Sequence, residues 1–190
     1  MKRSLLLTAV LAFLAVGLGG WALAQSYTFE RSSKIWVEGT SSVHDWTCNV
    51  AQFAGTVAAE PADAGLAALT GTSLTVPVQG IDCDNGTMNG KVRDALGSSP
   101  IRFALTSATP AAPGADGWFQ IRATGDLTIN GTTRAVQMNV RARATDGGFR
   151  FTGQHALKMT DYGVRPPTAM LGALKTGDQV TVHFDATVAR

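Results

Sequence analysis

Strict alternation of apolar and polar residues is clearest in the stretch Phe149-Arg-Phe-Thr-Gly-Gln-His-Ala-Leu-Lys-Met159. Apart from Gly153 and His155, its odd-numbered residues are large and apolar, and its even-numbered residues are mostly polar. A period of two is the period of a strand that has one face on a core and the other in solvent. The stretch therefore predicts a long, half-buried β-strand.

The same alternation recurs on both sides of this stretch. Two of the links between alternating segments, Asn130-Gly131 and Asp146-Gly147-Gly148, are typical of tight β-hairpins. A bend is expected in the second segment near Gly55, since glycine often marks a kink in a strand. The pattern predicts eight strands, over residues 27–38, 43–60, 72–79, 100–107, 118–129, 134–143, 149–159 and 179–189.

Helical features are limited to two short segments. Residues 61–69 are rich in alanine, and residues 87–96 place apolar residues such as Met88 and Val92 at helical spacing. Thr87 is suited to cap the second segment, and Gly97 to end it. One or two short helices are therefore predicted.

Eight consecutive strands with hairpin-type links favour an all-β, up-and-down antiparallel barrel over a sandwich. The interior of an eight-stranded barrel is either filled by side chains or holds one small ligand. Small residues on the inward face, among them Ala123, Gly125 and Gly153, are compatible with a cavity or with barrel corners. The sequence leaves both interiors open.

The first 24 residues have the organisation of a secretory signal peptide. Lys2 and Arg3 precede an apolar run from Ser4 to Gly20, and the exit Ala22-Leu23-Ala24 follows. A membrane anchor is the alternative, but the run is short for a span and ends in glycines. We predict cleavage after Ala24, which leaves one exported domain at 25–190, periplasmic or secreted, without stable membrane insertion.

Removal of this leader changes the charge of the protein. The chain has 16 lysines and arginines, two of which lie in the leader, and the remaining 14 balance 14 aspartates and glutamates. Binding to nucleic acid needs clustered cations that neutralise phosphates. The neutral domain therefore predicts no nucleic-acid partner.

Cys48 and Cys83 are the only cysteines. An even pair in an oxidising compartment usually forms a disulfide. No CxxC motif indicates redox chemistry, and a metal site would need histidine or acidic partners at ligand spacing. Closing a loop of about 36 residues would stabilise the fold by about 3–4 kcal/mol in the chain-entropy model.

Ser42, His44 and Asp45 invite comparison with a catalytic triad, which needs the three groups to converge. On an extended strand the first two share a face and Asp45 points away. The histidines form no metal-binding motif, so we predict no enzyme, no metal site and no resident cofactor. His183 is expected in solvent, and His155 is either a hydrogen-bonded core residue or a polar contact for a ligand headgroup.

Four segments follow one another in a characteristic order. They are residues 39–48 (Gly-Thr-Ser-Ser-Val-His-Asp-Trp-Thr-Cys), 88–96 leading into 100–103, 125–136, and 159–170 followed by 177–182. Together they resemble the YceI-like family of secreted lipid- and polyisoprenoid-binding proteins. The resemblance implies a lipocalin-like barrel, a long apolar ligand such as an isoprenoid quinone or polyprenyl chain in its pore, and no enzymatic activity.

Such a ligand would be held mainly by burial of apolar area, at about 25 cal/mol per Å². The predicted ligand contacts are inward-facing residues, each of which is equally compatible with a plain core role. They are Phe53, Ile101, Phe103, Phe119, Ile121, Val136, Met138, Phe151, His155, Leu157 and Phe184. The segment Asp161–Thr176, with Pro166-Pro167, is either a lid over one barrel end or an ordered loop.

The leading hypothesis is thus an exported carrier whose partner is an apolar small molecule. The alternative is a non-enzymatic structural or stress-related interaction module with a filled barrel. The sequence does not give the oligomeric state and is compatible with a dimer.

Overall fold

The computed structural model describes residues 23–63, 65–110, 112–169 and 174–190. Of the predicted signal peptide, only Leu23 and Ala24 are among them, so that prediction lies outside the described residues. Within these ranges, no helix has the length and apolar character needed to cross a bilayer.

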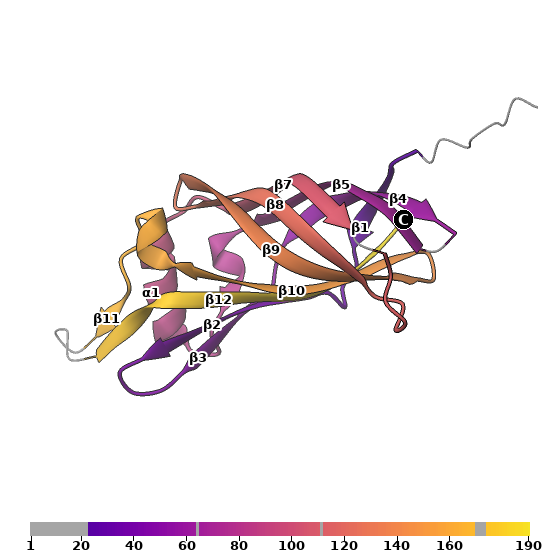
Figure 1. The fold of residues 1–190 in the computed structure, drawn as a ribbon. Helices are drawn as coiled ribbons and strands as arrows, with labels where there is room; N and C mark the ends of the chain where they lie inside the picture. Colours follow the sequence, from indigo (N-terminus) through magenta and orange to yellow (C-terminus); the bar gives the residue numbers. More distant parts are fainter. Residues whose placement is uncertain (1–22, 64, 111, 170–173) are drawn as a thin grey trace, which may run out of the picture.

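The predicted all-β fold is confirmed: residues 23–190, apart from the short gaps, form a closed, eight-stranded antiparallel barrel with one α-helix. Neighbours around the barrel follow chain order, and the last strand pairs back onto the first two, which closes the sheet. Figure 1 shows α1 and β11 at one end of the barrel, and β1 with the C-terminus at the other. The elements are β1 (Gln25–Phe29), β2 (Lys34–Ser41), β3 (Trp46–Val50), β4 (Ala54–Ala62), β5 (Gly65–Val76), η1 (Val78–Gly80), β6 (Ile81–Asp82), α1 (Gly86–Leu96), β7 (Ile101–Pro110), β8 (Phe119–Ile129), β9 (Thr132–Thr145), β10 (Gly148–Lys158), η2 (Met159–Tyr162), β11 (Thr168–Ala169) and β12 (Leu174–Ala189).

The first predicted strand, 27–38, is broken into β1 and β2, which pair with the same edge of β12. A turn at residues 30–33 separates them, closed by the bond from Ser33 N to Glu30 O. Ser33 Oγ replaces the missing ladder bonds, since it donates to Thr187 O at 2.9 Å and accepts from Thr187 N at 3.0 Å. The break therefore leaves the barrel wall continuous.

The second predicted strand, 43–60, is broken into β3 and β4. The break lies at residues 51–53, so the predicted bend near Gly55 is misplaced. Ala51 N donates to Gly80 O at 2.7 Å, and β3 continues beside β6 while β4 pairs with β5. At this end of the barrel, the partner of β3 is the short β6 and not a long strand.

The predicted helix at 61–69 is wrong, because these residues form the hairpin between β4 and β5. Alanine favours helix only weakly, and pairing with neighbouring strands overrides that preference. Gly65 has φ +118°, a left-handed conformation that suits glycine at the turn. Leu66 and Leu69 are buried in the barrel as a result.

The predicted helix at 87–96 is confirmed as α1, with one difference at its start. The cap is Asn85, whose Oδ1 accepts from Met88 N at 3.0 Å, and not Thr87. Gly97 ends the helix with φ +70°, and its N–H donates to Arg93 O. No residue of α1 is fully buried, so the helix lies on the barrel and not within its core.

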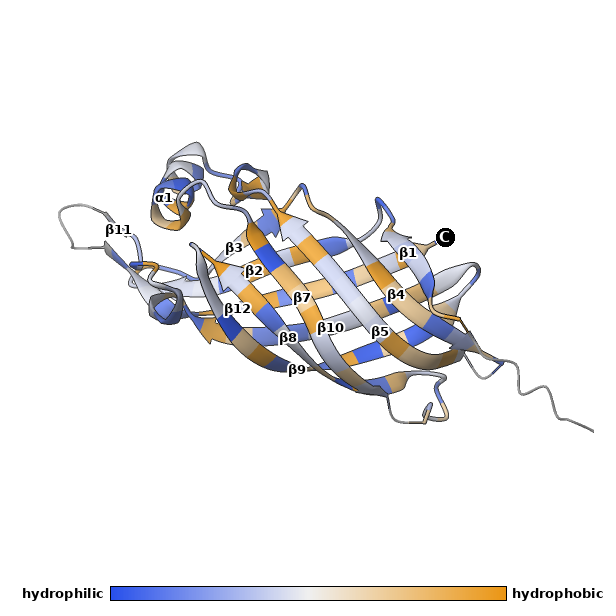
Figure 2. Ribbon diagram, turned by 90° about the horizontal axis from the view of Figure 1, so that it is seen from above, coloured by the Kyte–Doolittle hydropathy of each residue, from blue (hydrophilic) through white to orange (hydrophobic). Residues whose placement is uncertain are grey.

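Along the strands, apolar and polar residues alternate as expected (Figure 2). The inward residues form two differently packed halves. One, here called the closed end, is a buried cluster at the end of the barrel that carries β1 and the C-terminus. Its buried members are Tyr27, Val57, Ala59, Leu66, Leu69, Phe119, Ile121, Ala123, Val140, Ala142, Phe149, Phe151 and Val188.

The other half, here called the mouth, lies beneath α1. Two smaller clusters of buried residues form its walls, and half-buried side chains from α1 pack against both. Their buried members are Ile35, Cys48, Val50, Val76, Ile81 and Cys83 in one cluster, and Ile129, Tyr162 and Val164 in the other.

Candidate functional site

A cavity of about 880 Å³ occupies the mouth half of the barrel. Every long strand of the barrel contributes to its wall, together with α1 and the segment that follows β10. Exposed residues such as Val43, His44 and Lys175 also line it, so the cavity reaches the surface at this end. Its volume lies in the upper part of the range for small-molecule sites, about 300–1,000 Å³, and its wall is mainly aliphatic and aromatic.

The floor of the cavity is the closed end. Val57, Leu69, Ala123, Val140 and Phe151 belong to the closed-end cluster and also line the cavity. Below them aromatic rings meet directly, as in the edge-to-face pair of Tyr27 and Phe149, whose ring centroids are 5.2 Å apart. The barrel is therefore filled at one end and hollow at the other.

Seven of the eleven predicted ligand contacts line this cavity. Their side chains come from β7, β9, β10 and β12, the strands with the clearest alternation. They are Ile101, Phe103, Met138, Phe151, His155, Leu157 and Phe184.

The other four predicted contacts lie elsewhere. Phe119 and Ile121 point inward but belong to the filled closed end, where they are 4% and 1% exposed. Val136 is buried without lining the cavity. Phe53 lies in the break between β3 and β4 and packs edge-to-face on Phe29, with ring centroids 5.6 Å apart. For these positions the geometry fits the core role, and the ligand role stays a prediction.

The small inward residues Gly125 and Gly153 do not mark empty space. A Cβ on Gly125 would lie 2.4 Å from the Phe103 ring, and one on Gly153 would lie 2.5 Å from the Phe184 ring. The glycines thus provide the room that two rings in the cavity wall occupy. The interpretation as cavity-forming gaps is corrected accordingly.

Several residues of α1 that were not among the predicted ligand contacts line the cavity, and the large apolar ones are Met88, Val92 and Leu96. They are spaced four apart and so form one stripe of the helix. That spacing was the available signal, although nothing in it distinguished contact with a ligand from contact with the barrel. The helix thus forms part of the cavity roof.

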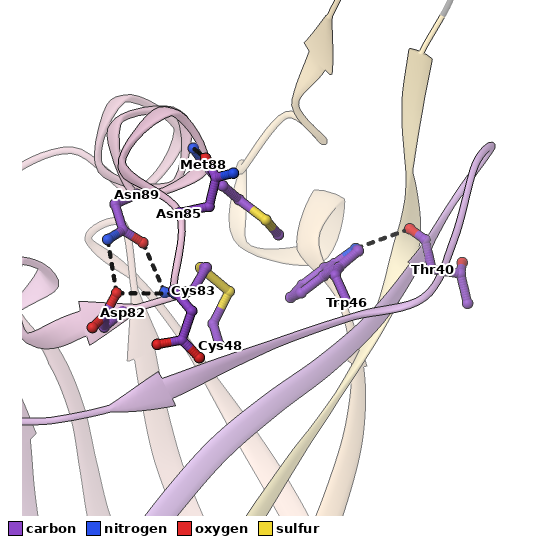
Figure 3. Close-up of a disulfide and its surroundings, with 9 residues drawn as sticks. Thr40, Trp46, Cys48, Asp82, Cys83, Asn85, Met88 and Asn89 are labelled. Carbon is purple, nitrogen blue, oxygen red and sulfur yellow. Dashed lines mark hydrogen bonds between the residues drawn. A yellow bond between two sulfur atoms is a disulfide. The ribbon is translucent and has the colours of Figure 1, made fainter.

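A disulfide joins β3 to the segment that leads into α1. Cys48 and Cys83 both line the cavity wall, and their Cα atoms are 4.0 Å apart. In Figure 3, Met88 extends from the helix toward the space between the disulfide and Trp46. The crosslink therefore ties the start of the roof to the wall of the barrel.

Hydrogen bonds around Asn89 reinforce this junction (Figure 3). Asn89 Nδ2 donates to Asp82 Oδ1 at 2.8 Å, and Asn89 Oδ1 accepts from Cys83 N at 2.7 Å. The bond from Asn89, followed by that from the Asp84 backbone, lowers the pKa of the exposed Asp82 carboxyl. The carboxylate is thus the form that holds the junction together.

On the opposite side, the roof contacts the segment 161–176. Lys91 Nζ donates to Thr168 O at 3.0 Å, which links α1 to β11. Tyr162 and Val164 are buried against the mouth, and Val164, Pro167 and Thr168 line the cavity. The described part of this segment therefore helps to form the rim, which is the edge of the cavity where it reaches the surface. Residues 170–173 lie outside the described ranges.

Trp46 lies at the rim beside the hairpin that joins β2 and β3. Its ring covers Gly39, where an added Cβ would lie 2.2 Å from the ring. Its Nε1 donates to Thr40 O at 3.1 Å, as Figure 3 shows. Trp46 is thereby held as a fixed part of the cavity wall.

The side chains of Ser42 and His44, two of the residues compared with a triad, contact backbone groups. Ser42 Oγ accepts from Lys175 N at 3.1 Å, and His44 Nδ1 lies 2.7 Å from the carbonyl oxygen of Asp45. Within the described ranges, no three histidine, cysteine or acidic side chains gather as a metal site would require.

The other two histidines differ in their surroundings. His155 is half-buried in the cavity wall, and burial lowers its pKa, partly opposed by a hydrogen bond with the Gln137 backbone. Burial thus favours the neutral imidazole. His183 lies on the outer face, stacked on Trp36 and 3.1 Å from Glu38 Oε2, so it is less exposed than expected.

A closed antiparallel barrel with an apolar internal cavity defines a lipocalin-like architecture. The YceI-like domain model matches residues 27–188, and the chain belongs to that family. No curated protein sequence matches the chain.

Solved structures show the same fold at low sequence identity. The Burkholderia cenocepacia protein BcnA is 20% identical with a TM-score of 0.64, over 83% of this chain and 96% of its own. A polyisoprenoid binding domain from Saccharophagus degradans, implicated in plant cell wall breakdown, is 13% identical with a TM-score of 0.64, over 86% and 97%. A Campylobacter jejuni YceI protein is 15% identical with a TM-score of 0.55, over 74% and 82%.

Proposed function

We propose that this protein is an exported carrier that holds one long apolar ligand inside its barrel without chemical change. The observation that carries the proposal is the apolar cavity of about 880 Å³. An isoprenoid quinone, polyprenyl chain or other lipid would bury its tail there, with about 25 cal/mol of favourable free energy per Å² of apolar surface. The similar domain from Saccharophagus degradans, described as polyisoprenoid-binding, supports this ligand class.

Two features support export as part of the proposal. The predicted leader would direct the chain out of the cytoplasm. The Cys48–Cys83 disulfide is typical of proteins in an oxidising compartment. A periplasmic or secreted carrier is consistent with both.

The alternative, an interaction module with a filled barrel, requires an interior without free space. The cluster of buried side chains at the closed end is packed, but the mouth half encloses the cavity. The cavity therefore favours the carrier.

Mass spectrometry of organic extracts tests the proposal. The full chain would be expressed with its leader and purified without detergent, beside Leu157→Trp, which fills the cavity, and Ala156→Trp, which adds the same ring to the exposed face of β10. We expect close to one lipid per protein in the wild type and in A156W, and little in L157W. Absence of lipid from all three, or equal amounts in all three, would contradict the carrier.

A further inference from the structure

The charged residues of the cavity lining are two lysines. Lys91 and Lys175 line the cavity together with His44 and His155, and no aspartate or glutamate of the described residues does. Only four lysines lie outside the predicted leader, and two of them are here. An apolar cavity with cations and no carboxylate favours a ligand that supplies the negative charge.

The two lysines converge on one part of the rim. Lys91 Nζ on α1 bonds Thr168 O on β11, and Thr168 is the cross-strand partner of Lys175 on β12. Ser42 bonds the Lys175 backbone in both directions, which places the β2–β3 hairpin, with His44, beside them. Three separate elements therefore bring basic groups to the same place.

Carboxylates of the described chain do not neutralise these lysines. The three contacts between basic and acidic side chains found among residues 23–63, 65–110, 112–169 and 174–190 join Arg141 to Asp116, Arg150 to Asp185, and His183 to Glu38. The nearby Asp178 is bonded by Thr160, through both N and Oγ1. An ammonium has three donors, and the carbonyl of Thr168 takes only one from Lys91.

Building on the proposed function, we propose that the ligand is a single-chain amphiphile with an anionic headgroup, a carboxylate or a phosphate, bound between Lys91 and Lys175. The chain lies in the apolar cavity, and the headgroup remains at the rim. There it takes hydrogen bonds from both ammonium groups, which are stronger than neutral ones because both partners are charged. The partial exposure of the rim spares the anion most of the cost of leaving water.

Affinities for matched ligand pairs test this assignment. The pairs are geranylgeranyl monophosphate with geranylgeraniol, and hexadecanoate with hexadecanol, each titrated below its aggregation concentration at fixed ionic strength. The proteins are wild type, K91Q, K175Q, K91Q/K175Q and the control Lys158→Gln, a lysine of β10 that does not line the cavity.

We expect the wild type and K158Q to bind the anion of at least one pair about tenfold or more tightly than its alcohol, as charge-assisted bonds would give. In K91Q/K175Q the ratio should fall to about one, with the affinity for the alcohol unchanged. If the anion is preferred over its alcohol only in the phosphate pair, the ligand class is a prenyl phosphate. If it is preferred only in the carboxylate pair, the ligand class is a fatty acid.

Two results would overturn the inference and leave the carrier intact. One is equal affinity for anion and alcohol in the wild type. The other is an equal loss for both in the double variant, since lysines that only hold the roof in place would act on every ligand alike. Failure of all four ligands to bind would instead overturn the proposed function and the inference with it.

Discussion

The closed end and the mouth of this barrel are built from the same alternating strands, yet their interiors differ. At the closed end, side chains from opposite walls meet, as Tyr27 and Phe149 do. At the mouth, the walls stay apart, and a helix without a fully buried residue covers the space. The helix is held on the barrel by a disulfide and a few hydrogen bonds, and not by a packed core. The comparison teaches that one sheet can hold a packed core at one end and open space at the other.

The largest expected effect is loss of an aromatic ring from the closed end. Phe119→Ala should lower the free energy of unfolding by about 3–5 kcal/mol, because a large cavity would open in a packed cluster. Phe103→Ala at the mouth should cost clearly less, since its ring already faces open space. Chemical denaturation of both variants measures the difference, and equal losses would contradict the division into two halves.

The second effect concerns the crosslink at the mouth. Replacing both cysteines, C48A/C83A, should lower the free energy of unfolding by about 3–4 kcal/mol through the freed unfolded chain. Hydrogen exchange should accelerate in α1 and leave the Phe119 strand, β8, comparatively protected. Uniform acceleration through both halves would show that the disulfide supports the whole barrel and not its roof.

The third prediction is a substitution that should change ligand affinity more than the free energy of unfolding. Leu157→Trp should weaken binding of geranylgeraniol at least about tenfold, because the larger ring occupies ligand space, while the free energy of unfolding changes by about 1 kcal/mol or less. Ile121→Trp at the closed end should do the reverse, since that residue is 1% exposed and has no room for growth. Titration and denaturation of both variants provide the check.

The smallest effect is a pH dependence at the mouth. Because burial lowers the pKa of His155, the unfolded chain takes up a proton more readily than the folded one. This residue therefore contributes a loss of stability as the pH falls through the unfolded-state pKa, about 6.5. His155→Gln should reduce that loss between pH 7.5 and 5.5, and His44→Gln at the exposed rim serves as the control. An unchanged pH profile in H155Q would contradict the role assigned to burial.

Alternation predicted the eight barrel positions but not the breaks within them. Between β1 and β2 the inward parity is preserved, with Phe29 and Ile35 both odd-numbered, so no sequence signal marks the turn. Between β3 and β4 it changes, from Cys48 and Val50 to Val57. This change of the inward-facing residues from even to odd numbers indicates the break better than Gly55 does.

Alternation also separates inside from outside without giving depth along the barrel axis. Phe119 and Phe151 have the same inward signature, but only Phe151 reaches the cavity. Depth depends on register and tilt across the whole sheet, which involve partners distant in sequence. For the same reason, nothing local to Lys91 or Lys175 predicted that they would meet at one rim.

The most direct test of the hollow mouth is a crystal structure with a prenyl alcohol that carries bromine at the tail end. We expect one anomalous bromine peak per barrel at the cavity floor, beside Ala123 and Val140, with the hydroxyl toward Lys91 at the rim. A barrel without bromine, or bromine bound only on its outer face, would contradict it.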